Sequence, residues 1–218
     1  MGRWFSGAPI LRAPNADDPV LGQDADANNA FSYVRAPASM SPAQHSQAAG
    51  DGYAPAHVDN LGLICPHAAH IRRAYPRDDA TLEISEAQIE THRLLRPGIV
   101  FGQPLPAPGD RGLMFLAYQT SFERQFEFVT RAWLNNPSFR NNGDGYDPIA
   151  GQNSEGRGTR VRIFGLPTRN ADGTITKISV SLPVDWVIPT GGGYFSHLPS
   201  GHCAILRRLP AMKRSRSG

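Results

Sequence analysis

The clearest hydrophobic pattern lies in the middle of the chain. Residues 112–119 form a continuous apolar run of strand length, which predicts a buried strand. Residues 121–134 follow directly, with Ser121 as a suitable N-cap and an Asn-Asn-Pro sequence from Asn135 that ends a helix. Four apolar side chains recur there at helical spacing: Phe122, Phe126, Val129 and Trp133. The pattern therefore predicts a strand followed at once by an amphipathic helix with this face buried.

Several shorter segments have the composition of strands. Residues 93–101, interrupted by Pro97-Gly98, predict a strand with a kink or bulge, and Ser85 can begin a short helical turn. Three further strands are expected, the first two joined by a turn at Asp172-Gly173: residues 161–164, 176–182 and 185–195. One clear helix among several strands predicts an α+β fold.

The two ends of the chain differ from this pattern. Residues 1–60 are rich in Asn, Asp, Ala, Pro and Gly without a helical or strand period, so we expect an irregular wrapping segment or linker. Residues 61–210 are expected to form the folded domain, and residues 211–218 a basic tail. With a net charge of only +3, a solvated tail is favoured over a nucleic-acid-binding arm.

Composition narrows the class of protein further. The two cysteines, Cys65 and Cys203, allow one disulfide but do not indicate a disulfide-stapled secreted domain. No apolar run reaches the ~18 residues of a membrane span. The N-terminal residues lack the apolar region of a signal peptide, which predicts a cytoplasmic protein.

Histidines and a cysteine gather in one short segment. Cys65, His67 and His70 lie close together in sequence, and His92 follows further along. Thiolate and imidazole are zinc ligands, although no paired zinc-finger spacing is present. A single haem-ligating histidine is a second interpretation, and partly buried histidines with ordinary hydrogen bonds are a third. Spacing alone leaves the three open.

The segment has a family resemblance. Residues 65–78, CPHAAHIRRAYPRD, resemble the segment that carries the proximal haem histidine in dye-decolourising peroxidases. Seven more stretches resemble family blocks in the right order: GRWFSGAP (2–9), NNAFSY (28–33), HRLLRPGIVFG (92–102), RGLMF (111–115), ERQFEF (123–128), DPIAGQ (147–152) and TGGGYF (190–195). The ordered series covers nearly the whole chain, so the sequence is identified as a member of this family over the C-terminal half of its fold.

The resemblance implies a fold and an activity. Residues 61–210 would form a haem-binding, ferredoxin-like α+β domain of the dimeric α+β barrel type, an antiparallel sheet with helices on one face. The cofactor would be haem b. The protein would use hydrogen peroxide to oxidise dyes or phenolic compounds, without nucleic-acid or membrane partners.

The same resemblance assigns roles to five residues. His70 matches the proximal ligand of the haem iron, and Asp147 matches a carboxylate that accepts a hydrogen bond from its imidazole. Arg96 matches the distal arginine, whose guanidinium can stabilise negative charge on a peroxide oxygen. Leu113 and Phe115 match residues that shape the distal pocket, and they are expected in the core under any interpretation. Alternatively, Arg96 is a surface arginine and Asp147 a turn residue. We expect His67 to be structural.

One departure from the family limits the predicted activity. The family's distal acid is the Asp of a G-x-x-D-G motif that lies before the region matched here. Three Asp-Gly pairs occur in this chain, but the residues three positions before their aspartates are Ala48, Asn141 and Arg169. We therefore expect low activity unless a second polypeptide with the N-terminal half supplies the acid. The alternative is a non-catalytic haem-binding or interaction fragment, whose exposed apolar surface would favour such a partner or a homo-oligomer.

Overall fold

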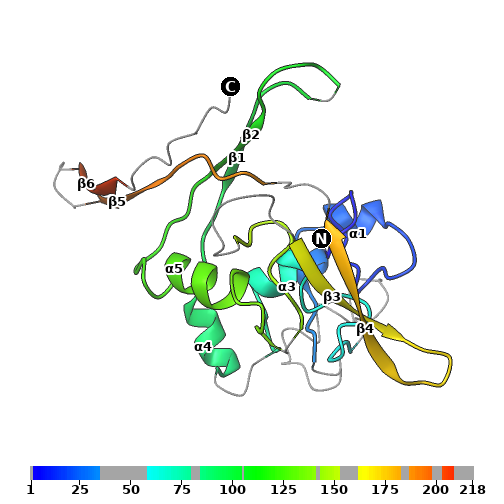
Figure 1. Cartoon of the computed structure of the whole chain (residues 1–218). Coiled ribbons are helices and arrows are strands. Elements are labelled where there is room, and N and C mark those ends of the chain that lie inside the picture. The colour runs from blue at the N-terminus through cyan, green and yellow to red at the C-terminus, as the bar shows by residue number, and fades with distance from the viewer. Residues whose placement is uncertain are drawn as a thin grey trace, which may run out of the picture. The chain divides into compact units, whose positions relative to one another are not determined.

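The computed structural model describes residues 2–34, 58–79, 84–104, 106–140, 143–152, 162–182, 187–197 and 203–208 (Figure 1). The chain divides into two compact units, Met1–Val184 and Asp185–Gly218. The predicted basic tail, and residues 35–57 of the predicted linker, lie outside the described residues.

The first unit contains short helices and two pairs of strands. Its helices are α1 (Pro19–Gln23), the 3-10 helix η1 (Ala27–Asn29), α3 (His70–Ala74), α4 (Glu86–Thr91), α5 (Phe126–Phe128) and the π-helix η3 (Val129–Leu134). Its strands are β1 (Gly98–Phe101), β2 (Gly112–Phe115), β3 (Arg162–Arg169) and β4 (Ile175–Leu182), and the second unit has β5 (Gly193–His197) and β6 (Cys203–Arg208). None of the described helices is long and apolar enough to cross a membrane.

The described strands pair only in twos, as the antiparallel ladders β1–β2, β3–β4 and β5–β6. The predicted turn between β3 and β4 is present, because the Asn170 N–H donates to Thr174 O at 2.8 Å and Gly173 has a φ of 84°. Helices and antiparallel strands together confirm the predicted α+β class.

The N-terminal segment is more regular than its composition predicts. Asp18 caps α1 by accepting the N–H groups of Val20 and Leu21, and Pro19 fixes the first helical residue. Phe31 and Tyr33 pack with Cys65 and Ala69 in one cluster, so this segment covers the chain that leads into α3.

The prediction of a buried strand over residues 112–119 was wrong. Strand β2 ends at Phe115 and all four of its residues are exposed, with Leu113 57% and Phe115 45% exposed. Its only described partner is β1, which is exposed along its whole length as well. A hairpin of two strands has no apolar layer to pack against, so an apolar sequence does not bury it.

The predicted helix over residues 121–134 begins later than its sequence pattern suggests. Ser121 caps only a turn, with its hydroxyl accepting the Arg124 N–H at 3.2 Å. The Gln125 side chain accepts the N–H groups of Thr120 and Ser121, and α5 starts only at Phe126. The helix then widens, so that the Asn135 N–H donates to Thr130 O five residues back.

The four apolar side chains of the predicted helical face are not equally buried. Val129 and Trp133 are buried as predicted, whereas Phe122 and Phe126 are only partly buried. Trp133 lies in a cluster with Ile89, Val129, Leu134 and Phe139, against which Ala74 of α3 also packs.

This packing predicts unequal costs for two truncations. Trp133→Ala should lower the free energy of unfolding by about 3–5 kcal/mol, because Trp133 is almost completely buried. Phe126→Ala should cost less, about 1–2 kcal/mol, since its side chain is only partly buried. Urea unfolding followed by circular dichroism measures both. Equal costs would mean that Phe126 belongs to the core and that the helix begins near Ser121.

Candidate functional site

The centre of the candidate site is a hydrogen bond between α3 and a loop far along the chain. His70 is the first residue of α3, and its Nδ1 lies 2.9 Å from Oδ2 of Asp147. The His70 side chain is 28% exposed, whereas Asp147 is fully buried. An ionised carboxylate only accepts hydrogen bonds, so Nδ1–H of His70 is the donor. The lone pair of Nε2 is then available to a metal.

The second carboxylate oxygen of Asp147 accepts two backbone hydrogen bonds. Oδ1 accepts the N–H of Ile149 at 2.8 Å and that of Ala150 at 2.7 Å. Burial alone would raise the pKa of Asp147, but the hydrogen bond and charge of His70, with these two backbone donors, hold it below its usual value. The carboxylate therefore stays ionised at neutral pH and keeps one orientation toward His70.

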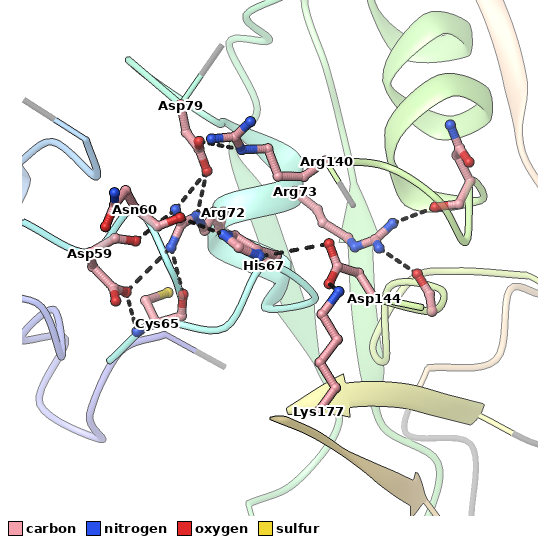
Figure 2. Close-up of polar contacts among 12 residues, drawn as sticks. Asp59, Asn60, Cys65, His67, Arg72, Arg73, Asp79, Arg140, Asp144 and Lys177 are labelled. Carbon is pink, nitrogen blue, oxygen red and sulfur yellow. Dashed lines mark hydrogen bonds and ion pairs between the residues drawn. The ribbon is translucent and has the colours of Figure 1, made fainter. Parts of the chain in front are cut away.

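Two neighbouring arginines of α3 point to opposite sides of the helix (Figure 2). Arg72 donates from Nε to Asp79 at 2.7 Å, from one terminal nitrogen to Cys65 O at 2.8 Å and from the other to Asp59 O at 2.9 Å. Its guanidinium also lies over the ring of Tyr33, 4.4 Å from the centroid. Arg72 thus ties α3 to the segments that precede and follow it.

Arg73 makes its contacts with the segment that leads to Asp147. It donates to Trp133 O at 2.7 Å, to Asn136 O at 2.8 Å and to Gly145 O. Burial lowers the pKa of Arg73 to about 10, opposed by the charges of Asp147 and Asp144, so the guanidinium remains charged at neutral pH. Arg72 and Arg73 are respectively 1% and 0% exposed, which is rare for arginine.

Asp144 links the same loop to β4. Lys177 donates to its Oδ1 at 2.6 Å, and His67 Nδ1 lies 3.7 Å from its Oδ2 (Figure 2). Burial would raise the pKa of Asp144, but the hydrogen bonds and charges of His67 and Lys177 lower it. His67 Nε2 lies 3.2 Å from Asn60 O. The described contacts of His67 are thus with protein groups, as the structural role predicted for it requires.

The zinc interpretation finds no support in the described part of the chain. Among those residues, no three His, Cys, Asp or Glu side chains gather closely enough to hold a metal ion. Cys65 is buried and free, and burial raises the pKa of its thiol to about 12. His92 stacks on Phe128 with ring centroids 3.8 Å apart, and its Nδ1 contacts Arg124 O.

The structure does not bring all the predicted site residues together. His70 and Asp147 meet, as the resemblance implies, whereas Arg96 is exposed just before β1. No hydrogen bond or ion pair among the described residues joins Arg96 to that pair. Leu113 and Phe115 are exposed on β2, which corrects the expectation that they lie in the core under any interpretation. The Phe115 ring lies near the first residue of α5, with its centroid 5.9 Å from that of Phe126.

Sequence reasoning missed the residues that hold α3. Arg72 and Arg73 belong to the segment of residues 65–78 that resembles the family, but no role was predicted for them. Lys177 lies in the strand predicted over residues 176–182 and also had no predicted role. The acidic residues on each side of residues 65–78 could have indicated a buried ion pair, because Asp59 and Asp79 both pair with Arg72.

Comparison with known proteins gives consistent matches. Residues 45–145 match the family model of the C-terminal domain of Dyp-type peroxidases. A dye-decolorizing peroxidase of Exidia glandulosa is 33% identical over 210 residues, covering 91% of this chain and 35% of the relative. The dye-decolorizing peroxidase AauDyP1 of Auricularia auricula-judae is 32% identical over 225 residues, covering 97% and 38%. The chain thus spans well under half the length of these relatives.

Solved structures give the same result. A fungal DyP-type peroxidase from Auricularia auricula-judae superposes with a TM-score of 0.57 and 31% identity, over 83% of this chain and 39% of that one. A dye-decolorizing peroxidase whose heme pocket was engineered for asymmetric sulfoxidation gives a TM-score of 0.59 and 30% identity, over 84% and 39%. These likenesses confirm the fold class predicted from the sequence.

Proposed function

Because the chain belongs to the Dyp-type peroxidase family through its C-terminal domain, we propose that it binds haem b and takes part in peroxide-dependent oxidation of dyes or phenolic compounds. His70 is the proximal ligand of the iron in this proposal. The single observation that carries it is the hydrogen bond of 2.9 Å between His70 Nδ1 and the buried carboxylate of Asp147.

The chemistry of these donors fits a haem ligand. A metal-bound histidine typically donates its second ring N–H to a carboxylate or carbonyl, which fixes its tautomer and makes the ligating nitrogen more basic. Asp147 does this for His70, and the exposed fraction of His70 leaves a side open to a cofactor. Haem, when bound, supplies the iron that reacts with peroxide. Asp147 would give the imidazole imidazolate character, which favours higher oxidation states of the iron.

Arg96 is proposed as the distal residue. Its guanidinium is charged at every physiological pH and donates in a fixed fork. It would stabilise the negative charge that develops on a peroxide oxygen as the O–O bond breaks. A guanidinium has no hydrogen-bond acceptor, so a separate group is needed to move the proton between the two oxygens. Leu113 and Phe115 of β2 are proposed to shape the same side of the pocket once that strand is covered.

The proton-transfer group is proposed to come from residues outside these 218, on the same or on a second polypeptide. Two local carboxylates are poor candidates, since Asp144 is paired with Lys177 and Asp147 with His70. No G-x-x-D-G motif occurs in the sequence. The relatives are more than twice as long as the matched region, which leaves ample chain for such a group.

A second candidate function rests on the β1–β2 hairpin. Its exposed apolar side chains, between 45% and 80% exposed, are Ile99, Val100, Phe101, Leu113, Met114 and Phe115. Such a surface favours association with an N-terminal half or a second copy of the chain. On this alternative, the chain alone is a non-catalytic haem-binding or interaction fragment.

Haem binding tests the ligand. Purified chain titrated with haemin should develop a Soret band, and His70→Ala should abolish it because the iron loses its axial ligand. His92→Ala and His67→Gln are matched controls that should keep the band, since their described contacts are with protein groups. Equal loss in all three variants, with circular dichroism unchanged, would contradict the assignment of His70.

Peroxide turnover tests the distal side. The haem-loaded chain should oxidise a phenolic dye about 10²–10⁴-fold more slowly than a full-length family member, because it lacks the acid–base group. Arg96→Leu should lower the remaining rate by about 10²–10³-fold. Adding a polypeptide with the N-terminal half should raise the rate of the unmodified chain. A lone chain as fast as a full-length relative would refute the proposal that the acid lies elsewhere.

A further inference from the structure

Arg73 lies one helical turn after His70 on α3, yet it contacts the segment that carries the partner of His70. Its three acceptors are the carbonyls of Trp133, Asn136 and Gly145. They belong to the end of η3 and to the loop that follows, up to two residues before Asp147. The Arg73 side chain therefore contacts the start of the loop and also its later part, close to Asp147.

Arg73 is not the only group that holds this loop. The Asp144 carbonyl accepts the Gly165 N–H at 3.2 Å, and Arg140 forms an ion pair with Asp79 at 2.6 Å. The Asp147 N–H donates to Leu134 O at 3.0 Å, and the Gly145 N–H donates to Pro137 O at 3.0 Å. The last carbonyls of a helix have no partner within the helix, and Arg73 takes that of Trp133. Its guanidinium thus fixes the end of η3 and the approach to Asp147 relative to α3.

From this arrangement we propose that Arg73 is the positioning residue of the His70–Asp147 pair. By clamping residues 133–145 onto α3, its guanidinium keeps the Asp147 carboxylate within hydrogen-bonding distance of His70 Nδ1. The relevance to haem rests on the proposed function, but the clamp itself is a property of the chain.

The charge of Arg73 adds to the geometric effect. The charges of Asp147 and Asp144 favour the protonated form of Arg73, which keeps the guanidinium charged beside the loop that it contacts. His67 and Lys177 face Asp144, whereas His70 faces Asp147. A lysine at position 73 would keep the charge and lose the fork that reaches three carbonyls.

Arg72 provides a matched control within the same helix. It is as deeply buried as Arg73, but its described side-chain hydrogen bonds are all with residues 59–79. Its link to residues 133–147 is indirect, through Asp79, which also pairs with Arg140. A purely structural role for buried arginines predicts equal effects of Arg72→Lys and Arg73→Lys. The positioning role predicts an effect on His70 from Arg73→Lys alone.

The experiment is ¹⁵N NMR of the full chain with labelled histidines and without added haem. The Nδ1–H signal of His70, assigned by its loss in His70→Gln, should be visible in the unmodified chain and in Arg72→Lys. It should be lost to solvent exchange in Arg73→Lys, with circular dichroism unchanged. In haem-loaded protein, transfer of haem to apomyoglobin should be about tenfold faster for Arg73→Lys than for Arg72→Lys.

Three results would overturn the proposal. One is a His70 signal that is unchanged in Arg73→Lys, and another is a signal that is lost equally in both variants. The third is an Arg73→Lys chain that does not fold while Arg72→Lys does, because Arg73 would then serve the whole fold rather than the pair. If no variant binds haem but the signal is lost only in Arg73→Lys, the clamp stands and the haem-binding proposal fails.

Discussion

The structure around the site depends on the burial of two adjacent arginines in a helix of five residues. A guanidinium taken out of water is costly unless its N–H groups find acceptors, and removing those acceptors leaves an uncompensated charge. Arg72 meets this requirement with Asp59, Asp79 and Cys65 O. The two terminal nitrogens of Arg73 meet it with three carbonyls of residues 133–145, while its buried Nε has no hydrogen-bond partner among the described residues. A helix as short as α3 is not stable alone, so these contacts hold it.

As a consequence, contacts within the chain fix the part of the candidate site around His70. On the His70 side, the donor, the carboxylate and the loop beneath it are all fixed by contacts within the chain. On the side of Arg96, Leu113 and Phe115, the hairpin has neither a covering layer nor a third strand among the described residues. This asymmetry fits a chain that matches less than half the length of its relatives.

The sequence predicted the parts that local chemistry determines. The β3–β4 turn follows from Asp172-Gly173, and the start of α4 follows from Ser85, which caps it as predicted. The partnership of His70 and Asp147 came from family resemblance, since 77 residues separate them and no spacing rule joins them.

The failures have separate physical causes. Residues 112–119 are apolar, but an apolar pattern does not reveal whether a second layer packs on the strand, and the described partner of β2 is the exposed strand β1. The late start of α5 accompanies a hydrogen bond from the Phe126 N–H to the Gln119 side chain, because a helix from Ser121 would donate that N–H to the Phe122 carbonyl. The sequence did not predict the burial of Arg72 and Arg73, because arginine side chains normally lie in solvent.

Hydrogen exchange of the full chain, followed by mass spectrometry, tests the central claim most directly. If buried arginines hold α3 against residues 133–147, the amides of both segments should exchange slowly and at the same rate, while the β1–β2 hairpin exchanges fast. Exchange in α3 as fast as in that hairpin would contradict the account, because the His70–Asp147 pair would not be preformed.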